Sequence, residues 1–463
     1  MATHATPLDD AVDDLRETFR GTLIEVSDEG YDEARAIYNA MIDRRPALIA
    51  QCVDAGDVVA AVNFGRGQEL EIAVRSGGHN GPGLSLVDDG LVVDLSPMTG
   101  VHVDPEAKTV RVEPGCTWGD VDHATHAFGM ATVSGIISTT GVGGLTLGGG
   151  HGYLTRQYGL TIDNLLGVDV VLADGSLVHA DEDEHSELFW AVRGGGGNFG
   201  VVTSFEFQCH DVDTVVAGPL FWPLDDLETT MRWYRDWLAE APRDVYAFYA
   251  VGEVPGDPFP PDIHGEKFCG LLWCVPSGDE ELAEEHLRQA RAAAEPMFEH
   301  VGAMPYPALQ SLFDDLYPAG DQWYWKGDFV YDLTDEAIAA HGRHAEVPTP
   351  KSTMHLYPID GAVHDVADDA TAWNYRDATW SMVIAGVDAD PANEGVITDW
   401  ARNYWEAVHP HDAEGAYVNF MMEEGDERVR ATYGDNYERL QRVKAQYDPD
   451  NLFHVNHNVE PAA

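Results

Sequence analysis

The first group in the chain with a chemical use is a histidine that follows two glycines. His79 comes directly after Gly77 and Gly78, beyond an apolar run that predicts a strand at Glu71–Val74. A loop without Cβ atoms can bring successive backbone N–H groups close to a phosphate, and a neutral imidazole is a competent nucleophile. By itself this turn is weak evidence, because most loop histidines are structural.

A second segment is far richer in glycine. Residues 141–152 hold seven glycines in twelve positions, interleaved with Val142, Leu145 and Leu147. We interpret the segment as a buried loop, because this density of glycine disfavours a helix or a strand and flexible linkers favour polar residues. It fits neither the dinucleotide fingerprint of a Rossmann fold nor a Walker loop. We therefore expect its backbone to pass close to a large flat or phosphorylated ligand.

A third cluster begins with four consecutive glycines. Gly194–Gly197 precede Asn198, Phe199 and Gly200, and a strand is predicted directly after them at Val201–Phe207. Here too the backbone is expected to lie close to another group.

The chain resembles the berberine-bridge-enzyme-like branch of the vanillyl-alcohol-oxidase flavoproteins over about residues 47–461. It carries, in the order typical of that family, RSGGHN (75–80), GVGGLTLGGGHGYLTRQYGLTIDN (141–164), LFWAVRGGGGNFGVVT (188–203) and YDPDNLFHVNHN (447–458). Four motifs in this order make a chance match improbable. The resemblance implies an FAD-dependent oxidoreductase with a two-domain, PCMH-type FAD-binding fold.

The resemblance also implies which residues hold the FAD. His79 matches the histidine that is bonded to the 8α-methyl group of the flavin, and residues 75–81 match the pyrophosphate loop. Residues 141–152 match the glycine loop beside the flavin ring. The other residues implied in cofactor binding are Arg75, Ser76, Gly77, Gly78, Asn80, Gly81, Thr140, Gly141, Gly144, Gly148, Gly149, Gly150, Gly152, Asn198, Gly200, Val202, Asn451 and Asn456.

The sequence departs from many relatives at a second attachment point. Those relatives have a cysteine ahead of the glycine loop that also bonds the flavin, and Ile137 stands in that slot here. We therefore expect one covalent bond, through His79. Thr140 stands where relatives tune the access of oxygen to the flavin, and its small polar side chain does not decide between an oxidase and a dehydrogenase.

Oxidation of a C–H bond beside O–H or N–H requires hydride transfer to flavin N5 and a base for the proton. The resemblance points to Tyr417, with Asn419 in the same AYVN segment; a tyrosine of lowered pKa would serve, and a packed core tyrosine is an equal interpretation. Some relatives carry a polar residue that faces the substrate on the strand at 380–384, and the matching positions here, Met382 and Ile384, are apolar. Tyr153 is a further catalytic candidate, and weaker candidates for the pocket wall are Tyr324, Lys326, His355 and Tyr357.

Three functions remain open. The first is an FAD enzyme that oxidises an alcohol, a sugar or an amine, with O₂ as the acceptor and H₂O₂ as a product. The second is a dehydrogenase that passes electrons to a quinone or a protein. The third is a flavin-binding protein without catalysis, which the apolar Met382 and Ile384 favour.

These motifs need elements that position them. Over about residues 45–210, short strands, turns and helical patterns at Asp57–Gly67 and Trp118–Phe128 predict an α+β arrangement. Together with the resemblance, this gives an FAD-binding domain at 1–211 with its core at about 42–211, a substrate domain at 212–405 and a returning C-terminal segment at 406–463. The substrate domain is expected to be an antiparallel sheet flanked by helices, with elements at Leu227–Ala239, Tyr246–Val251, Lys267–Val275, Glu280–Ala293, Thr353–Pro358 and Tyr375–Ile384.

The charge of the chain restricts its partners. There are 80 acidic and 27 basic residues, and the formal net charge is −53. A surface of this sign repels nucleic acid and anionic membranes, which both need a basic footprint. Molar salt would screen the self-repulsion, so we infer a halophilic host. The expected partners are a small-molecule substrate and an electron acceptor.

The cysteines and the first residues place the protein in a cell compartment. Five cysteines form no disulfide framework, and Cys269 and Cys274 lack a second ligand pair, so no metal site is expected. Residues 1–20 contain acids and no apolar core, unlike a signal peptide, and no apolar run approaches about 18 residues. We expect a cytoplasmic protein.

Overall fold

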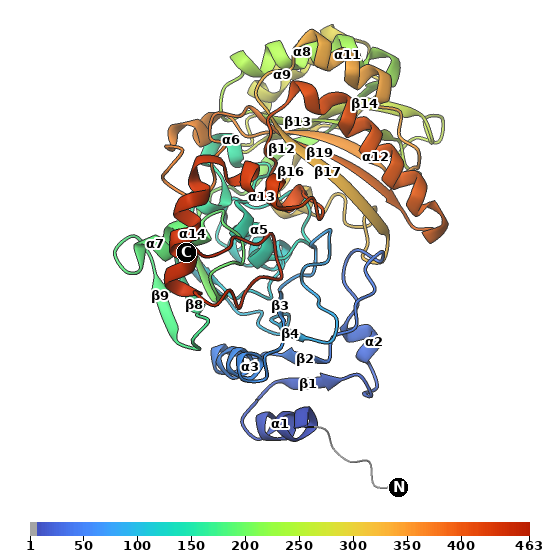
Figure 1. Cartoon of the computed structure of the whole chain (residues 1–463). Helices are drawn as coiled ribbons and strands as arrows, with labels where there is room; N and C mark the ends of the chain where they lie inside the picture. The colour runs from blue at the N-terminus through green and yellow to red at the C-terminus, as the bar shows by residue number, and fades with distance from the viewer. Residues whose placement is uncertain (1–6) are drawn as a thin grey trace.

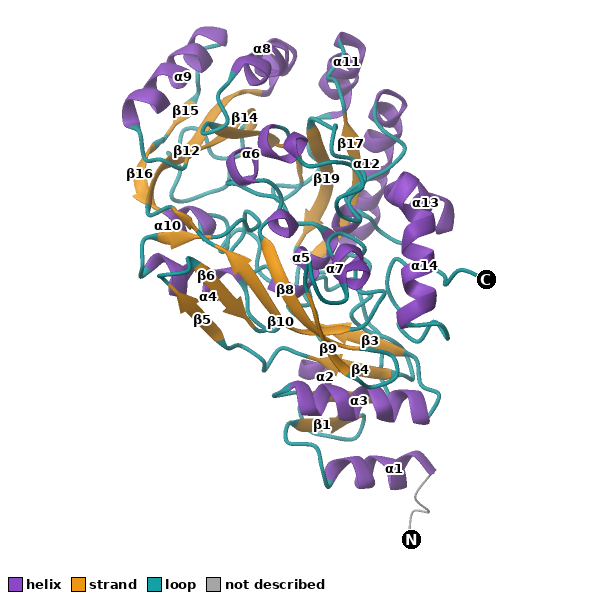
Figure 2. Cartoon of the chain, turned by 90° about the vertical axis from the view of Figure 1, so that its left-hand side faces the viewer, coloured by secondary structure: helices purple, strands orange, loops and turns teal. Residues whose placement is uncertain are grey.

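The computed structural model describes residues 7–463, so the first six residues of the expected FAD-binding domain and of the N-terminal stretch lie outside the described part. Helices and mostly antiparallel sheets are combined in two halves, which confirms the α+β prediction (Figures 1 and 2). One half contains both the beginning and the end of the described chain, and the other contains one large sheet beneath helices. Among residues 7–463, no helix has both the length and the apolar character needed to cross a membrane.

A small sheet near the N-terminus delivers the histidine loop. Its strand order is β1-β2-β4-β3, in which β2 and β3 run parallel to β4 and β1 runs antiparallel to β2. All four residues of β4 are buried, and the side chain of Asp54 caps the helix α3 by accepting from the N–H of Asp57. The bounds are α1 (Pro7–Arg16), β1 (Thr22–Glu25), α2 (Tyr31–Ala34), β2 (Leu48–Gln51), α3 (Ala55–Gly67), β3 (Ile72–Arg75) and β4 (Leu91–Asp94).

A second, five-stranded sheet completes this half. Its order is β5-β6-β10-β8-β9, and every neighbouring pair is antiparallel. The helix α4 begins with a capping box formed by Thr117 and Asp120. The bounds are β5 (Val101–Asp104), β6 (Thr109–Val112), α4 (Trp118–His126), β7 (Met130–Ala131), α6 (Thr155–Tyr158), β8 (Leu165–Val171), β9 (Leu177–Ala180), α7 (Ser186–Val192), β10 (Val201–Gln208) and β11 (His210–Asp211).

The glycine-rich segment is not the loop that its composition predicts. Residues Val142–Gly148 form a helix, α5, and the loop begins only at Gly149. Tertiary packing overrides the low helix propensity of glycine here. A Cβ built on Gly143 would lie 3.0 Å from Ser76 Oγ, and one on Gly148 would lie 2.4 Å from Asn419 Nδ2, so a larger residue at either position would have to displace these side chains.

The other half is built on one eight-stranded antiparallel sheet. Its order is β15-β12-β14-β13-β18-β19-β17, with β16 paired to β12. The helices α8, α9, α11 and α12 lie above it in Figure 1. The bounds are β12 (Thr214–Pro223), α8 (Leu227–Glu240), β13 (Tyr246–Glu253), β14 (Lys267–Val275), α9 (Glu280–Ala293), β15 (Phe298–Glu299), β16 (Gly302–Pro305), α10 (Tyr306–Gln310), β17 (Gln322–Val330), α11 (Asp335–His344), β18 (Thr353–Pro358), β19 (Trp380–Asp388) and α12 (Glu394–Val408).

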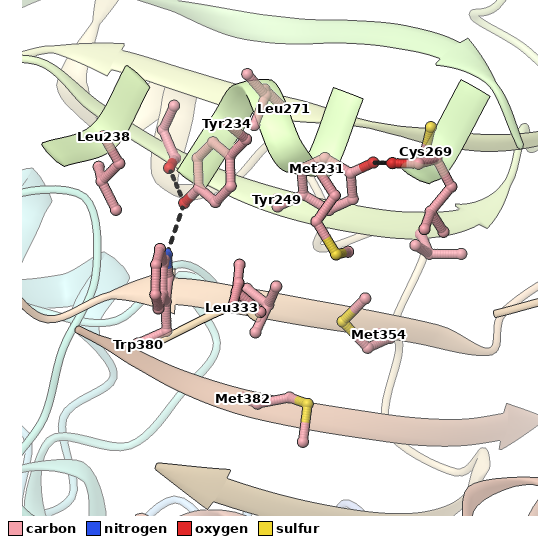
Figure 3. Packing of buried hydrophobic residues seen from close by; sticks show 14 of the residues in the cluster. Met231, Tyr234, Leu238, Tyr249, Cys269, Leu271, Leu333, Met354, Trp380 and Met382 are labelled. Atoms are coloured by element: carbon pink, nitrogen blue, oxygen red, sulfur yellow. Dashed lines mark hydrogen bonds between the residues drawn. The ribbon is translucent and has the colours of Figure 1, made fainter. Parts of the chain in front are cut away.

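The two faces of this sheet bury different residues. Side chains alternate along a strand, so Leu271 belongs to the core under the helices while Leu272 lies on the opposite face. Figure 3 shows the helix-side core, to which Met231 of α8, Met354 and Met382 all belong. The expectation that Met382 and Ile384 face the substrate is therefore wrong. Because side chains alternate along the strand, the residues that face the cavity are one position later, at Val383 and Ala385. The strand itself begins at Trp380, not at Tyr375.

The C-terminal segment returns to the first half. The helices α13 (Asp426–Tyr433) and α14 (Tyr437–Tyr447) pack into the same core as the five-stranded sheet. Lys444 is fully buried, pairs with Asp448 at 2.6 Å, and donates to the backbone oxygens of Asn198 at 2.7 Å and Phe453 at 2.9 Å. This buried ion pair ties the chain end to the Asn198 turn. The exact division into three segments stays a prediction.

Candidate active site

A cavity of about 1050 Å³ runs between the two halves. Its wall includes the loop after β3, the helix α5, the turn at Gly196–Gly200 and the C-terminal residues Phe453–His457. The opposite wall comes from the eight-stranded sheet, including Phe248, His355 and Tyr357. Segments more than 300 residues apart in the sequence therefore meet around one space.

The histidine loop and the glycine-rich helix are in direct backbone contact. A Cβ built on Gly77 would lie 2.6 Å from the Cα of Gly141, and the converse distance is also 2.6 Å. Real Cβ atoms do not approach a backbone so closely, so both positions require glycine. Around Gly144, which lines the cavity, a built Cβ meets no atom within 4 Å. The helix therefore borders open space in the cavity at Gly144, and the residue before it, Gly141, packs tightly against the histidine loop.

His79 lies half-buried on the cavity wall. Its ring stacks on Tyr38 with centroids 3.8 Å apart, and its Nε2 lies 3.5 Å from Thr139 Oγ1. Burial lowers the pKa of His79 to about 4, so the imidazole is neutral at neutral pH. A neutral, oriented ring is the form in which histidine acts as a nucleophile.

Several buried polar atoms around the cavity lack a protein partner. Among the described residues these include both ring nitrogens of His151, the Tyr433 hydroxyl, Asn456 Oδ1 and His457 Nε2. All four residues line the cavity. Burying polar atoms without partners costs free energy, so such a group indicates that a polar ligand completes the site.

Tyr417 lines the cavity with its hydroxyl oxygen held by two donors. The backbone N–H of Gly150 donates to it over 3.1 Å and Asn419 Nδ2 over 2.7 Å. Burial nonetheless raises the pKa of Tyr417 above its ordinary value, and the two hydrogen bonds only oppose that rise. Of the two interpretations of this tyrosine, a raised pKa favours the packed phenol over a base of lowered pKa. Tyr417 is a protonated phenol whose oxygen is already used as an acceptor.

On the opposite wall, Tyr357 and His355 form a hydrogen-bonded pair on β18. Tyr357 contacts His355 Nδ1 through its hydroxyl, and His355 Nε2 lies 2.9 Å from Thr353 Oγ1. Thr353 Oγ1 in turn donates to the backbone oxygen of Val251 at 2.8 Å. Burial lowers the pKa of His355 to about 3, which keeps the imidazole neutral.

His151 sits between the two tyrosines. Its ring centroid is 4.8 Å from that of Tyr417 and 5.2 Å from that of Tyr357, and only 5% of the residue is exposed. Burial lowers its pKa to about 3. No feature of the sequence distinguished this histidine from the other glycine-loop residues, and it joins the site through tertiary packing alone.

One part of the cavity wall is aromatic. Phe221 stacks on Phe268 at 4.0 Å between centroids and on Phe259 at 5.9 Å. Among the described residues no lysine or arginine lines the cavity. The carboxylates on its wall are Glu253, Asp257 and Asp315, and the first is paired with Lys267 at 2.5 Å. This wall was missed from the sequence, because its phenylalanines come from separate strands and a loop.

The cavity brings many of the predicted residues together. Those on its wall are Ser76, Gly77, Gly78, His79, Asn80, Thr140, Gly141, Gly144, Gly148, Asn198, Gly200, Val202, Tyr417, Asn419 and Asn456. On the strand at 380–388 the wall residues are Val383 and Ala385.

Other predicted residues lie behind the wall. Arg75 forms a buried bidentate pair with Asp94, and Tyr153 is fully buried beside Tyr246 and Phe248. Asn451 has a positive φ of 53° in the turn after α14. The glycines that serve packing and are not on the wall are Gly81, Gly149, Gly150 and Gly152, whose built Cβ atoms would meet Trp325, Trp373, Thr161 and Gly135 within 2.4 Å.

The sequence matches two family models. One, described as an FAD binding domain, matches residues 46–181, and one described as berberine and berberine like matches residues 416–460. An FAD-linked oxidoreductase of Dictyostelium discoideum is 30% identical over 97% of this chain and 97% of its own. The (R)-6-hydroxynicotine oxidase of Paenarthrobacter nicotinovorans is 30% identical over 96% of this chain and 97% of its own.

Solved structures share the fold over nearly the whole length. The 6-hydroxy-D-nicotine oxidase of Arthrobacter nicotinovorans has a TM-score of 0.86 at 28% identity, covering 99% of this chain and 100% of that chain. The glucooligosaccharide oxidase of Acremonium strictum, described with a 6-S-cysteinyl, 8α-N1-histidyl FAD, has a TM-score of 0.85 at 24% identity, covering 98% of this chain and 99% of that chain. The PCMH-type FAD-binding fold expected from the sequence is thereby confirmed.

Proposed function

The chain belongs to the FAD-linked oxidoreductases that carry a berberine-like C-terminal segment, and from this membership we propose that it oxidises an alcohol, a sugar or an amine with FAD held by one covalent bond to His79. The observation that carries the proposal is a neutral, oriented His79 on the wall of a cavity that passes the glycine helix. In that family the bound flavin supplies the two-electron acceptor for a hydride.

The residues around the cavity fit this cofactor. The open space at Gly144 and at Gly197 leaves room for a flat ring and a backbone-bound phosphate chain. The unpartnered atoms of Asn456 and His457 offer hydrogen bonds that no protein group satisfies among the described residues. We propose that the loop at 76–80 and the turn at Gly196–Asn198 hold the phosphates and adenosine, and that α5 lies along the ring.

A single covalent bond distinguishes the proposal from the doubly linked flavin in the glucooligosaccharide oxidase. Ile137, which lines the cavity, has no thiol to form a second link. Cys116, the cysteine nearest in sequence, is fully buried in the core of the five-stranded sheet. Burial also raises the pKa of its thiol to about 12, which leaves it a poor nucleophile.

The test is the intact mass of the denatured protein. Wild-type protein is expected to gain the mass of one FAD, and His79→Ala is expected to lose that gain. Thr139→Val, which removes only the hydroxyl near Nε2, is the matched control and keeps the mass gain. Flavin released by acid from the wild-type protein contradicts the covalent bond but not FAD binding.

Tyr417 and Asn419 are proposed to hold the oxygen or nitrogen of the substrate. Because the Tyr417 oxygen accepts from Gly150 and Asn419, its own O–H is directed to another acceptor, and a bound ligand supplies one. Tyr153 is buried behind the wall, so we propose no contact between it and the substrate.

The acceptor is proposed to be O₂, with H₂O₂ as the product, because the relatives with named activities are oxidases. A dehydrogenase is the second candidate. Reoxidation of the reduced enzyme in air within seconds, with one H₂O₂ per flavin, supports the oxidase, and slow reoxidation that a quinone accelerates supports the dehydrogenase. A non-catalytic protein is the third candidate: Met382 and Ile384 face the helices, but Val383 and Ala385, which line the cavity on the same strand, are also apolar.

The proposed setting is a salt-rich cytoplasm. The support is the net charge of −53 and five free, buried cysteines, which suit a reducing compartment. Unfolding measured across a series of KCl concentrations tests it, and a melting temperature that does not rise with molar KCl contradicts it.

A further inference from the structure

The ring that stacks on His79 comes from a segment outside all four glycine-rich and C-terminal motifs. Tyr38 lies in the loop between α2 and β2, and its ring covers one face of the imidazole, with centroids 3.8 Å apart and planes inclined by 20°. Tyr38 is only 5% exposed, whereas His79 is half-buried on the cavity wall. The more deeply buried tyrosine is therefore the fixed member of the stack.

Hydrogen bonds hold Tyr38 at both of its ends. Its hydroxyl donates to the Tyr317 carbonyl over 2.8 Å, and its backbone N–H donates to the Gly78 carbonyl over 3.2 Å. The Tyr38 carbonyl accepts from the N–H of Gly320 over 3.0 Å. Gly78 directly precedes His79, and Gly320 lies in the loop before β17. Tyr38 therefore joins the histidine loop to the half of the molecule that contains the eight-stranded sheet.

The next residue, Asn39, holds the other end of the histidine loop. Its Nδ2 donates to the Gly81 carbonyl over 2.8 Å and to the Trp323 carbonyl over 3.0 Å. Its Oδ1 accepts from the N–H of Trp323 over 3.1 Å, and the residue is 1% exposed. Because Gly78 and Gly81 flank His79, the short segment that carries the histidine is tied on both sides to residues 38 and 39.

Without these ties the imidazole would have several orientations open to it. Two glycines precede His79, the second of them, Gly78, has a positive φ of 67°, and a half-buried side chain can exchange between rotamers. The distance of 3.5 Å between His79 Nε2 and Thr139 Oγ1 is long for a hydrogen bond and restrains the ring weakly. Tyr38 is therefore the group that fixes the plane of the ring. Holding a reacting group in one orientation removes an entropic part of the barrier to bond formation.

We propose that Tyr38 is a positioning residue for the covalent attachment of FAD and acts by holding the His79 imidazole in the orientation that bonds the flavin. The proposal rests on the proposed function, which supplies the bond between His79 and the 8α carbon. In the net reaction one C–H bond of the 8α-methyl group and the N–H bond of the imidazole break, and a C–N bond forms. The two electrons and two protons that are released pass to O₂, giving H₂O₂. Tyr38 itself exchanges no proton or electron in this reaction.

The experiment measures FAD binding and bond formation separately in the full-length chain. Protein produced under riboflavin limitation, so that part of it carries no flavin, is mixed with excess FAD in air. Binding is followed by the quenching of flavin fluorescence, and bond formation by the intact mass of samples denatured at intervals. Wild-type protein is expected to bind FAD first and then to gain its mass. A wild-type protein that binds FAD and never gains the mass overturns the covalent bond of the proposed function together with this inference.

Three variants separate the ring of Tyr38 from its surroundings. Tyr38→Leu keeps an apolar side chain without a flat ring, and it is expected to form the bond at least about tenfold more slowly, with FAD affinity within about threefold of wild type. Tyr38→Phe keeps the ring and loses only the hydroxyl, so its rate is expected to stay within about threefold of wild type. Tyr317→Leu is the matched control: it removes another buried ring of the same apolar cluster, which packs on Trp323 instead, and it keeps the wild-type rate.

Several outcomes contradict the inference while the covalent bond itself stands. Attachment at the wild-type rate in Tyr38→Leu overturns it, and so does equal slowing in Tyr38→Leu and either Tyr38→Phe or Tyr317→Leu. If Tyr38→Leu does not fold, NMR of the flavin-free wild-type protein decides. The ring protons of His79, identified by their loss in His79→Ala, are expected upfield of those of the exposed His102, because a stacked phenol ring shields them. Unshifted His79 signals overturn the proposal.

Discussion

Both faces of the eight-stranded sheet bury apolar residues, but one face packs against helices and the other lines the cavity. On the helix face the tyrosine hydroxyls are bonded within the protein: Tyr234 donates to the Ala247 carbonyl at 2.9 Å and Tyr249 lies 2.8 Å from Thr230 Oγ1. On the cavity face, Tyr357 is bonded on one side only, and His151 across the space has no partner among the described residues. One face is a closed core, and the other is a surface that a ligand completes.

Two neighbouring leucines of β14 give the sharpest test of this difference. Leu271 is fully buried under the helices, while Leu272 is 2% exposed and lines the cavity. Leu271→Ala is expected to lower the free energy of unfolding by about 2–5 kcal/mol, because it leaves a void in a packed core. Leu272→Ala only enlarges an existing cavity, so we expect less than half that loss, measured by denaturant unfolding of the FAD-loaded protein.

For the rate of flavin reduction, we expect the larger effect from Leu272→Ala and the smaller one from Leu271→Ala. Leu272→Ala is expected to change the efficiency of flavin reduction by a substrate, and Leu271→Ala to leave it within about threefold at a temperature where both are folded. Equal losses of stability in the two variants would show that the faces do not differ in packing.

What the sequence could predict follows the same division. The wall proposed to hold the cofactor is encoded in contiguous stretches, so RSGGHN and the glycine segment already point to one side of the cavity. The opposite wall is encoded in alternate residues of strands such as β13, β18 and β19, which pair across long sequence separations. Because both faces of these strands are buried, no polar alternation reveals the register. That is why Met382 was placed on the wrong face, and why Val383 and the phenylalanine wall were missed.

The glycine segment shows a different limit of sequence reasoning. Its composition predicts a loop that passes close to a ligand. The segment does line the cavity, but Val142–Gly148 is a helix and not a loop. The space beside these glycines is limited by Ser76, Asn419 and the Gly77 backbone, which are about 60 to 280 residues away in the sequence. Propensity scales describe an isolated segment and contain no such neighbour.

Acid stability offers a smaller test of the helix face. His341 is buried behind the helix-face core with Nδ1 2.8 Å from the Tyr404 hydroxyl, and burial lowers its pKa to about 3. Because the folded pKa lies below the unfolded value of about 6.5, the neutral ring stabilises the fold above pH 6.5. That stability is lost as the pH falls toward 3, by up to about 1.4 kcal/mol for each pH unit.

His341→Asn is therefore expected to flatten the dependence of the free energy of unfolding on pH between 6.5 and 4.5. His102→Asn replaces an exposed histidine and serves as the control. A His341→Asn profile as steep as that of wild type would mean that other buried histidines account for the acid sensitivity.

The smallest expected changes in stability come from removing single tyrosine hydroxyl groups on the two faces. Tyr249→Phe removes a hydroxyl group that is hydrogen-bonded to Thr230 on the helix face. It is expected to lower the free energy of unfolding by about 1 kcal/mol, with no change in the rate of flavin reduction. Tyr357→Phe on the cavity face is expected to show the reverse, a larger kinetic loss and little change in stability, because Tyr357 lines the cavity and its hydroxyl is bonded only to His355. The two variants are compared by denaturant unfolding and by anaerobic reduction of the same preparations. A kinetic loss in Tyr249→Phe comparable with that in Tyr357→Phe would mean that disturbing either face misplaces the site, and the kinetic effect of Tyr357 would then be structural.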